Sequence, residues 1–135
     1  MKFVSIRIIT AEIKRLVGFY AAVTGVSPQW YTEDFAELVT EAGTLAIASE
    51  RTMQLFAAGA ARPAANASVI IELLVTDVDA TYRKILPHIG DPLLQQPTTM
   101  PWGNRSLLFR DPDGNLVNLF TPVSEAAIAK FARYA

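Results

Sequence analysis

Few side chains in this 135-residue sequence have types and spacing suited to chemistry. Cysteine is missing, so disulfides, thiolate metal sites and cysteine nucleophiles are excluded. His88 is the one histidine, and it follows Pro87 at the end of a predicted helix. Because a catalytic triad or a histidine metal cluster needs several converging groups, we interpret His88 as an exposed helix-end residue.

Four aspartates form two short acidic clusters. Asp77 and Asp79 lie at the start of a predicted helix, and Asp111 and Asp113 lie in a predicted turn. Short acidic side chains at such places accept hydrogen bonds from backbone N–H groups. We therefore predict a helix cap and a turn here rather than a metal cluster.

Aromatic side chains are candidates for contact with a flat ligand. We interpret most of them as packing residues, because each ring buries a large area in a core. Trp102 differs, since it lies in the irregular segment 100–103, where a ring at the mouth of a cavity could stack on a planar molecule. We predict ligand contacts by four aromatic residues: Trp102, Trp30, Phe56 and Phe109.

The composition restricts the class of partner. Hydrophobic residues make up 51% of the chain and charged residues 19%, with a net charge of -1. A chain of this length buries a substantial core, and its scattered Lys and Arg lack the field of a nucleic-acid binder. Its apolar runs are far shorter than the ~18 residues of a membrane span. We therefore expect a cytoplasmic protein with no nucleic-acid or membrane partner, for which the lack of cysteine fits a reducing compartment.

The first half of the chain changes hydrophobic period several times. A β-branched run predicts a strand at 3–9, and apolar residues at three- and four-residue spacing predict a helix at 11–23 that Gly25 ends. Short apolar or alternating runs at 30–31, 35–39, 45–48 and 53–56 then predict a meander of three short strands.

The second half repeats this order. We predict a strand at 68–75, a helix that Thr76 or Asp77 caps and Gly90 ends, strands at 93–98, 105–110 and 115–121, and a final helix at 124–134. Asp111-Pro112-Asp113-Gly114 predicts a type I turn between the last two strands.

The repeated order predicts an α+β fold of two βαβββ modules within a single domain, 1–135. The first module covers 1–59, a small-residue linker covers 60–66, the second module covers 67–122 and a C-terminal helix segment covers 123–135. Each module leaves one sheet face open, and two such faces can surround a common cavity, where a ligand belongs.

Four segments resemble the signatures of the vicinal oxygen chelate superfamily: 15–25, with Phe19-Tyr20 and Gly25, 75–80, 101–105 and 111–115. That superfamily contains glyoxalase I, extradiol dioxygenases, fosfomycin-resistance thiol transferases and bleomycin-resistance proteins. The resemblance covers nearly the whole chain. It implies the glyoxalase/bleomycin-resistance/dioxygenase fold, with cup-shaped mixed sheets around each site, and a homodimer.

Enzymes that this chain resembles hold a divalent metal through His, Glu or Gln on the first, fourth, fifth and eighth strands. Carried over, these positions are Ser5, a residue near Gln54, Ile70 and Asn118. Ile70 has no donor atom, and the hydroxyl and amide are poor neutral ligands. We therefore expect neither a metal nor another cofactor, and we assign Ser5, Gln54 and Asn118 to ligand binding.

The resemblance places Arg7 and Glu72 on neighbouring strands of the cup. One interpretation is a buried structural ion pair. The other makes them functional, with Arg7 orienting an anionic group and Glu72 accepting a proton or binding a cationic group.

Two functions remain open. The favoured one is a metal-free protein that sequesters a small aromatic or apolar molecule, a drug or a metabolite, as bleomycin-resistance proteins do. The alternative is a metal-independent enzyme, a lyase, an isomerase or a catalyst of related carbonyl chemistry, in which Glu72 or Arg7 is catalytic. Bleomycin itself is a poor match, because a cationic ligand favours an acidic cleft and this chain is nearly neutral.

Overall fold

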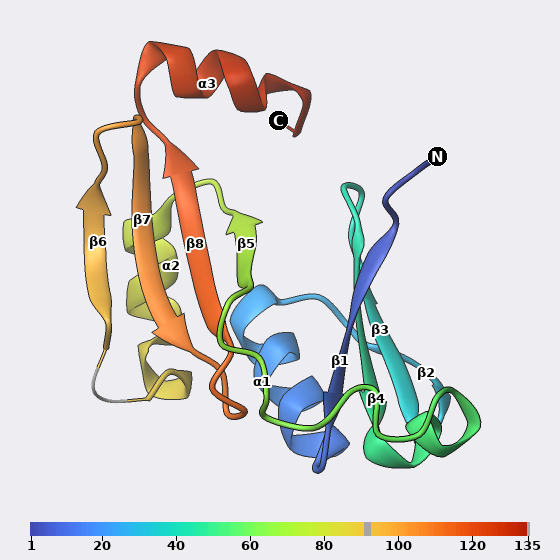
Figure 1. The fold of residues 1–135 in the computed structure, drawn as a ribbon. Coiled ribbons are helices and arrows are strands. Elements are labelled where there is room, and N and C mark those ends of the chain that lie inside the picture. Colours follow the sequence, from blue (N-terminus) through green and yellow to red (C-terminus); the bar gives the residue numbers. More distant parts are fainter. Residues whose placement is uncertain (91–92, 135) are drawn as a thin grey trace. The chain divides into compact units, whose positions relative to one another are not determined.

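The computed structural model describes residues 1–90 and 93–134. The chain divides into two compact units, Met1–Asn66 and Ala67–Ala135. Each unit contains one four-stranded mixed sheet and a helix between its first two strands, as Figure 1 shows. The α+β fold of two βαβββ modules predicted from the sequence is therefore confirmed. The end of the predicted C-terminal segment, residue 135, lies outside the described residues.

Unit 1 has the strand order β1-β4-β3-β2. Strand β1 runs parallel to β4, and the other neighbouring strands are antiparallel. The elements of this unit are β1 (Ser5–Thr10), α1 (Ile13–Thr24), β2 (Gln29–Thr32), β3 (Phe35–Val39), β4 (Thr44–Ser49) and the 3-10 helix η1 (Glu50–Leu55).

Helix α1 has the apolar stripe that its sequence predicts. The buried residues recur at three- and four-residue spacing and cover one face of the sheet. Gly25 ends the helix in the left-handed region, with φ 72°, and its N–H donates to the Ala21 carbonyl at 2.9 Å. The buried residues of α1 are Ile13, Leu16, Val17, Tyr20 and Val23.

The three strands predicted for this region are present as β2, β3 and β4, but the run at 53–56 is not one of them, because residues 50–55 form η1. Thr52 Oγ1 donates to the Ser49 carbonyl at 2.8 Å, a local bond that competes with pairing to a strand. Met53 turns back and packs against Ile9 and Ala48. Met53 therefore covers one end of the sheet, whereas Leu55 and Phe56 stay exposed.

Unit 2 repeats the topology with the order β5-β8-β7-β6, in which β5 runs parallel to β8. Its elements are β5 (Ile70–Leu74), α2 (Val78–Ile85), the 3-10 helix η2 (Leu86–His88), β6 (Gln95–Thr99), β7 (Asn104–Arg110), β8 (Leu116–Pro122), α3 (Glu125–Phe131) and the 3-10 helix η3 (Ala132–Tyr134). No helix among the described residues is long and apolar enough to cross a membrane.

The predicted cap and turn of unit 2 are confirmed. The Asp77 side chain accepts from the Ala80 N–H at 3.1 Å and begins α2. The Gly114 N–H donates to the Asp111 carbonyl at 3.0 Å. Asp111 Oδ1 also accepts from the N–H groups of Asp113 and Asn115, so the turn between β7 and β8 is held by its own side chains.

Candidate functional site

Each sheet has one face packed against its helix and one face turned away from it. Buried Ala36, Leu38 and Ile47 lie on the α1 side of the first sheet. Because side chains alternate along a strand, the residues between them lie on the opposite side. We call that side the distal face of unit 1; it contains Ser5, Arg7, Ile9, Phe35, Glu37, Thr44, Ala46 and Ala48.

Arg7 is the exposed cation of this distal face. Its guanidinium carbon lies 5.3 Å from the centroid of the Phe35 ring and 5.8 Å from that of Phe56. Both distances are within the range of a cation–π interaction. Phe56 follows η1 and is 65% exposed. Two rings from different segments thus hold one guanidinium at the surface.

Tyr31 and Glu37 lie beside this cluster. The Tyr31 and Phe35 ring centroids are 5.8 Å apart, and the Tyr31 hydroxyl donates to Gln29 Oε1 at 3.1 Å. Hydrogen bonding with Glu37, followed by burial, raises the pKa of Tyr31 above its usual value. The Glu37 carboxylate thus lies near Tyr31, which belongs to the neighbouring strand β2.

The face of the second sheet opposite α2 is the distal face of unit 2. Buried Leu107, Val117 and Leu119 lie on the α2 side, which leaves Ile70, Glu72, Leu74, Ser106, Leu108, Leu116 and Asn118 on the distal side. Glu72 and Asn118 are paired in register, and Asn118 Nδ2 donates to Glu72 Oε1 at 3.4 Å.

Three polar oxygens in β7 and β8 are buried without a hydrogen-bond partner among the described residues. They are Asn104 Oδ1, Ser106 Oγ and Asn118 Oδ1. Ser106 is 4% exposed. All three residues share the distal face, because Asn104 and Ser106 alternate with α2-side residues and Leu108 pairs with Asn118. A buried oxygen without a partner costs about 1–3 kcal/mol, so this face has unused hydrogen-bonding capacity.

The predicted site residues belong to two different units. Ser5, Arg7 and Phe56 belong to the distal side of unit 1, whereas Glu72 and Asn118 belong to that of unit 2. Arg7 and Glu72 thus lie in different sheets, each with its own partners.

Gln54 is not on the fourth strand, because β4 ends at Ser49 and Gln54 lies on η1 with its residue exposed. Phe109, predicted to contact a ligand, is 1% exposed and lies on the α2 side of β7. Its ring therefore packs in the core of unit 2. The type of a residue does not show where it lies in the fold. The end of β4 places Gln54 on η1, and the alternation of side chains along β7 places Phe109 on the α2 side.

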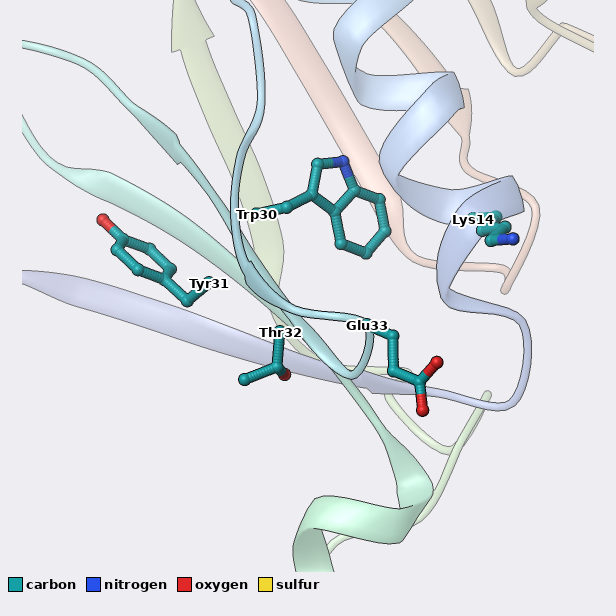
Figure 2. Close-up of a pocket in the computed structure, with 5 residues that line it drawn as sticks. All are labelled: Lys14, Trp30, Tyr31, Thr32 and Glu33. Atoms are coloured by element: carbon teal, nitrogen blue, oxygen red, sulfur yellow. The ribbon is translucent and has the colours of Figure 1, made fainter.

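Trp30 lies on the α1 side of the first sheet, away from Arg7. It pairs with Ala36 and is 43% exposed. Its ring lines a shallow hollow of about 290 Å³ together with Lys14, Tyr31, Thr32 and Glu33. Figure 2 shows the indole turned toward α1 and the Tyr31 side chain turned the other way. Trp102 is 65% exposed in the connection before β7.

The donor groups at the expected ligand positions do not fit a catalytic divalent metal. Ser5 lies opposite Thr44, so unit 1 offers hydroxyls, and unit 2 offers the single carboxylate of Glu72 beside an amide and Ile70. Within the part of the chain that the structure describes, no group of three His, Cys, Asp or Glu side chains could hold a metal ion. Divalent metals in enzymes need imidazole or several carboxylate ligands.

Two carboxylates are held by arginines that the sequence did not single out. Arg105 binds Asp79 through two hydrogen bonds of 2.7 and 2.9 Å. Arg51 Nε donates to Asp34 Oδ1 at 3.1 Å, and Ser49 donates to the same oxygen. The hydrogen bonds from these arginines lower the pKa values of Asp79 and Asp34. Asp79 is therefore an ion-pair residue, whereas only Asp77 of the predicted pair is the helix cap.

Known proteins share this sequence pattern and fold. Residues 2–119 match the model of the Glyoxalase/Bleomycin resistance protein/Dioxygenase superfamily. No curated protein matches the chain in sequence.

Solved structures with the same fold have little sequence identity to this chain. A glyoxalase/bleomycin resistance protein/dioxygenase family enzyme from Burkholderia phytofirmans has a TM-score of 0.77 and 16% identity, covering 88% of this chain and 97% of its own. A protein of unknown function from Agrobacterium tumefaciens has a TM-score of 0.75 and 24% identity, covering 90% and 94%. A glyoxalase-related enzyme from Fulvimarina pelagi has a TM-score of 0.74 and 18% identity, covering 89% and 87%.

Proposed function

Because this chain belongs to the glyoxalase/bleomycin resistance protein/dioxygenase superfamily, we propose that it binds a small organic molecule without using a metal. The observation that carries this proposal is the set of buried oxygens without partners on the distal face of unit 2, among the described residues. A ligand with hydrogen-bond donors regains there what the unbound protein leaves unused. Half-exposed Ile70 and Leu74 on the same face supply apolar area for the rest of the molecule.

The ligand is a drug or a metabolite that the protein sequesters, and the working form is a cytoplasmic homodimer. Glu72 and Asn118 provide the polar end of the site in this proposal. Asn118 Nδ2 already donates to Glu72, which leaves Asn118 Oδ1 and the carboxylate as acceptors for the ligand. The exposed ring of Trp102 is a stacking surface for a planar molecule.

Native mass spectrometry of freshly purified protein tests the proposal. We expect a dimer without metal that carries an organic adduct, and we expect Asn118→Leu to lose that adduct while it stays folded. Glu41→Gln is the matched control, because Glu41 is exposed in the turn before β4 and should keep the adduct. A divalent metal at one equivalent per subunit, or a protein to which no organic molecule binds, contradicts the proposal.

The second candidate function is metal-independent enzyme chemistry at Glu72. The observation that favours it is the Asn118 Nδ2 hydrogen bond, which orients the carboxylate on the distal face. A carboxylate oriented in this way can act as a general base at a carbon next to a carbonyl group. Arg7, the other catalytic candidate, lies in the other sheet.

Hydrogen–deuterium exchange in a panel of 2-oxo acids, followed by NMR in D₂O, tests this alternative. If Glu72 is the base, a chelator should not change the exchange rate. Glu72→Gln should lower that rate by about 100-fold or more. Exchange that stops with a chelator, or that Glu72→Gln leaves unchanged, excludes this role for Glu72.

A further inference from the structure

We propose that the distal face of unit 1 binds the carboxylate of a planar aromatic molecule, with the Arg7 guanidinium as the anion-binding group. This proposal rests on small-molecule binding as the function, and it adds a second recognition element and a ligand class. Its residues all lie within unit 1.

The position of Arg7 is fixed by rings rather than by carboxylates. Phe35 and Phe56 approach its guanidinium at 5.3 and 5.8 Å. Within residues 1–90 and 93–134, Arg7 makes no hydrogen bond or ion pair. The other arginines with assigned acidic partners, such as Arg51 and Arg105, have their donors occupied. Arg7 thus combines an orienting aromatic environment with unused N–H donors on this face.

Small residues of the central strand make this arrangement possible. Ala46 is the register partner of both Arg7 and Glu37, and Ala48 is the partner of Phe35. Because the alanine methyl groups project only a short distance above the sheet, the guanidinium and the Phe35 ring can approach each other over β4. A larger side chain at Ala46 would separate them.

Glu37 is the acidic residue nearest to Arg7 in the strand register, and it is the obvious competitor for the guanidinium. It faces the same side as Arg7 across Ala46, yet no ion pair joins the two among the described residues. Glu37 lies instead close enough to Tyr31 to raise the pKa of that phenol. The guanidinium therefore keeps its donors for a ligand.

The exposed rings define the rest of the ligand. Phe56 is 65% exposed, and such an aromatic ring gains burial when a flat molecule covers it. A carboxylate matches the planar fork of arginine through two parallel hydrogen bonds. An aromatic carboxylate satisfies both groups at once, with its charged end on Arg7 and its ring against Phe56.

Two probes with the same ring and nearly the same shape test this inference on the full chain: the anion 2-naphthoate and its neutral amide 2-naphthamide. Binding is measured by calorimetry, and the site is located from backbone amide NMR shifts. We expect naphthoate to bind about tenfold more tightly than naphthamide, with shifts on β1, β3 and the residues around Phe56. Arg7→Gln should remove this preference, and Phe56→Ala should weaken the binding of both probes.

Arg62→Gln is the matched control, because it makes the same change of charge at an exposed position in the segment that follows η1 and should leave the preference intact. Equal binding of the two probes, shifts on other strands, a preference that survives Arg7→Gln, or no binding of naphthoate at millimolar concentration overturns the inference. If naphthamide binds or an organic adduct is present while naphthoate is not preferred, only the assignment of the carboxylate fails. If neither probe binds and the protein carries no adduct, small-molecule binding fails as well.

Discussion

Single residues show that the arginines of this chain have two different roles. Arg105 and Arg51 each hold an aspartate through hydrogen bonds, whereas Arg7 is held between two phenylalanine rings. The first arrangement neutralises a carboxylate and contributes to folding. The second leaves a cation available at the surface. The distinction depends on partners that are far apart in the sequence, such as Asp79 on α2 and Arg105 on β7.

The Asp79–Arg105 pair predicts a specific pH dependence of stability. Its arginine lowers the pKa of Asp79 in the folded state, so the stabilisation is present above the unfolded value of about 3.9. It is lost as the pH falls through the lower, folded pKa. We therefore expect Asp79→Asn to lower Tm at neutral pH, with a difference from the wild type that shrinks below about pH 4.

Thermal unfolding between neutral and strongly acidic pH measures this effect. Glu41→Gln serves as the control, because this exposed carboxylate has no hydrogen bond or ion pair with any described residue and should not reproduce the effect of Asp79→Asn. A difference between Asp79→Asn and the wild type that stays constant with pH would contradict the prediction.

Tyr31 provides a second titration test. Hydrogen bonding with the Glu37 carboxylate favours the neutral phenol, which is why the pKa of Tyr31 is raised. Glu37→Gln removes the negative charge, so the phenol should ionise at a lower pH than in the wild type.

Ultraviolet absorbance of tyrosinate during alkaline titration, with Tyr31→Phe used to identify the signal, measures this shift. Glu33→Gln changes a nearby carboxylate that does not contribute to the shift, and it should leave the titration unchanged. If Glu37→Gln titrates like the wild type, Glu37 does not cause the raised pKa.

The sequence names side chains that are capable of chemistry, but it does not show what surrounds them in the fold. Arg7 and Glu72 were identified as chemically capable, and the structure supplies them with partners that periodicity cannot show, two rings and an amide. Phe109 was misplaced because an aromatic residue in a strand fits either face, and only the register with β8 sets its side. Gln54 was misplaced because β4 ends at Ser49 and the following residues form η1.

At the level of elements, the connection between β6 and β7 is tied to the beginning of α3. The Gly103 carbonyl accepts from the N–H groups of Val123 and Ser124 at 2.8 and 3.0 Å. Gly103 has φ 93°, and a Cβ there would collide with the Ser124 side chain. Ser124 in turn caps α3 by accepting from the Ala127 N–H. One glycine thus joins a strand connection to a helix cap.

Gly103→Ala should therefore destabilise the protein by more than about 2 kcal/mol, because it combines backbone strain with a collision. Gly18→Ala is the matched control. Gly18 lies exposed within α1, and a Cβ added there would meet nothing within 4 Å, so alanine should stabilise the helix by about 0.5–1 kcal/mol. Urea unfolding measures both, and equal effects of the two substitutions would contradict this account.

The order of the elements was predictable because hydrophobic period, caps and turn residues agree along most of the chain. Gly25, Asp77 and the 111–114 turn mark their boundaries as expected. The segment 53–56 was not predictable, because a short 3-10 helix with an apolar side resembles a short strand in sequence.

At the level of the whole molecule, a shared fold does not imply shared chemistry. The chain shares its fold with proteins that are 16% and 24% identical to it, while its donor groups differ from those that hold a metal in enzymes. Fold class could be derived from the repeated order of elements. The ligand could not, because its recognition depends on which side chains converge after folding.

Metal addition tests the proposal that this protein binds its ligand without a metal. We expect Zn²⁺, Mn²⁺ or Ni²⁺ to change Tm by less than about 1 °C, because a metal ion raises the stability only of a protein that binds it. A chelator should have no effect for the same reason. Differential scanning calorimetry of the wild type and Glu72→Gln measures this. A large rise in Tm that Glu72→Gln abolishes would identify Glu72 as a metal ligand and contradict the proposal.

The topology also sets the order of events during synthesis. Strands β1 and β5 each pair in parallel with the last strand of their own unit, β4 and β8. Neither sheet can be completed until that last strand has left the ribosome, yet the first sheet needs no strand from the second. The nascent chain can therefore finish one hydrogen-bonded sheet while the other is still being translated, which shortens the time that β1 remains without a partner.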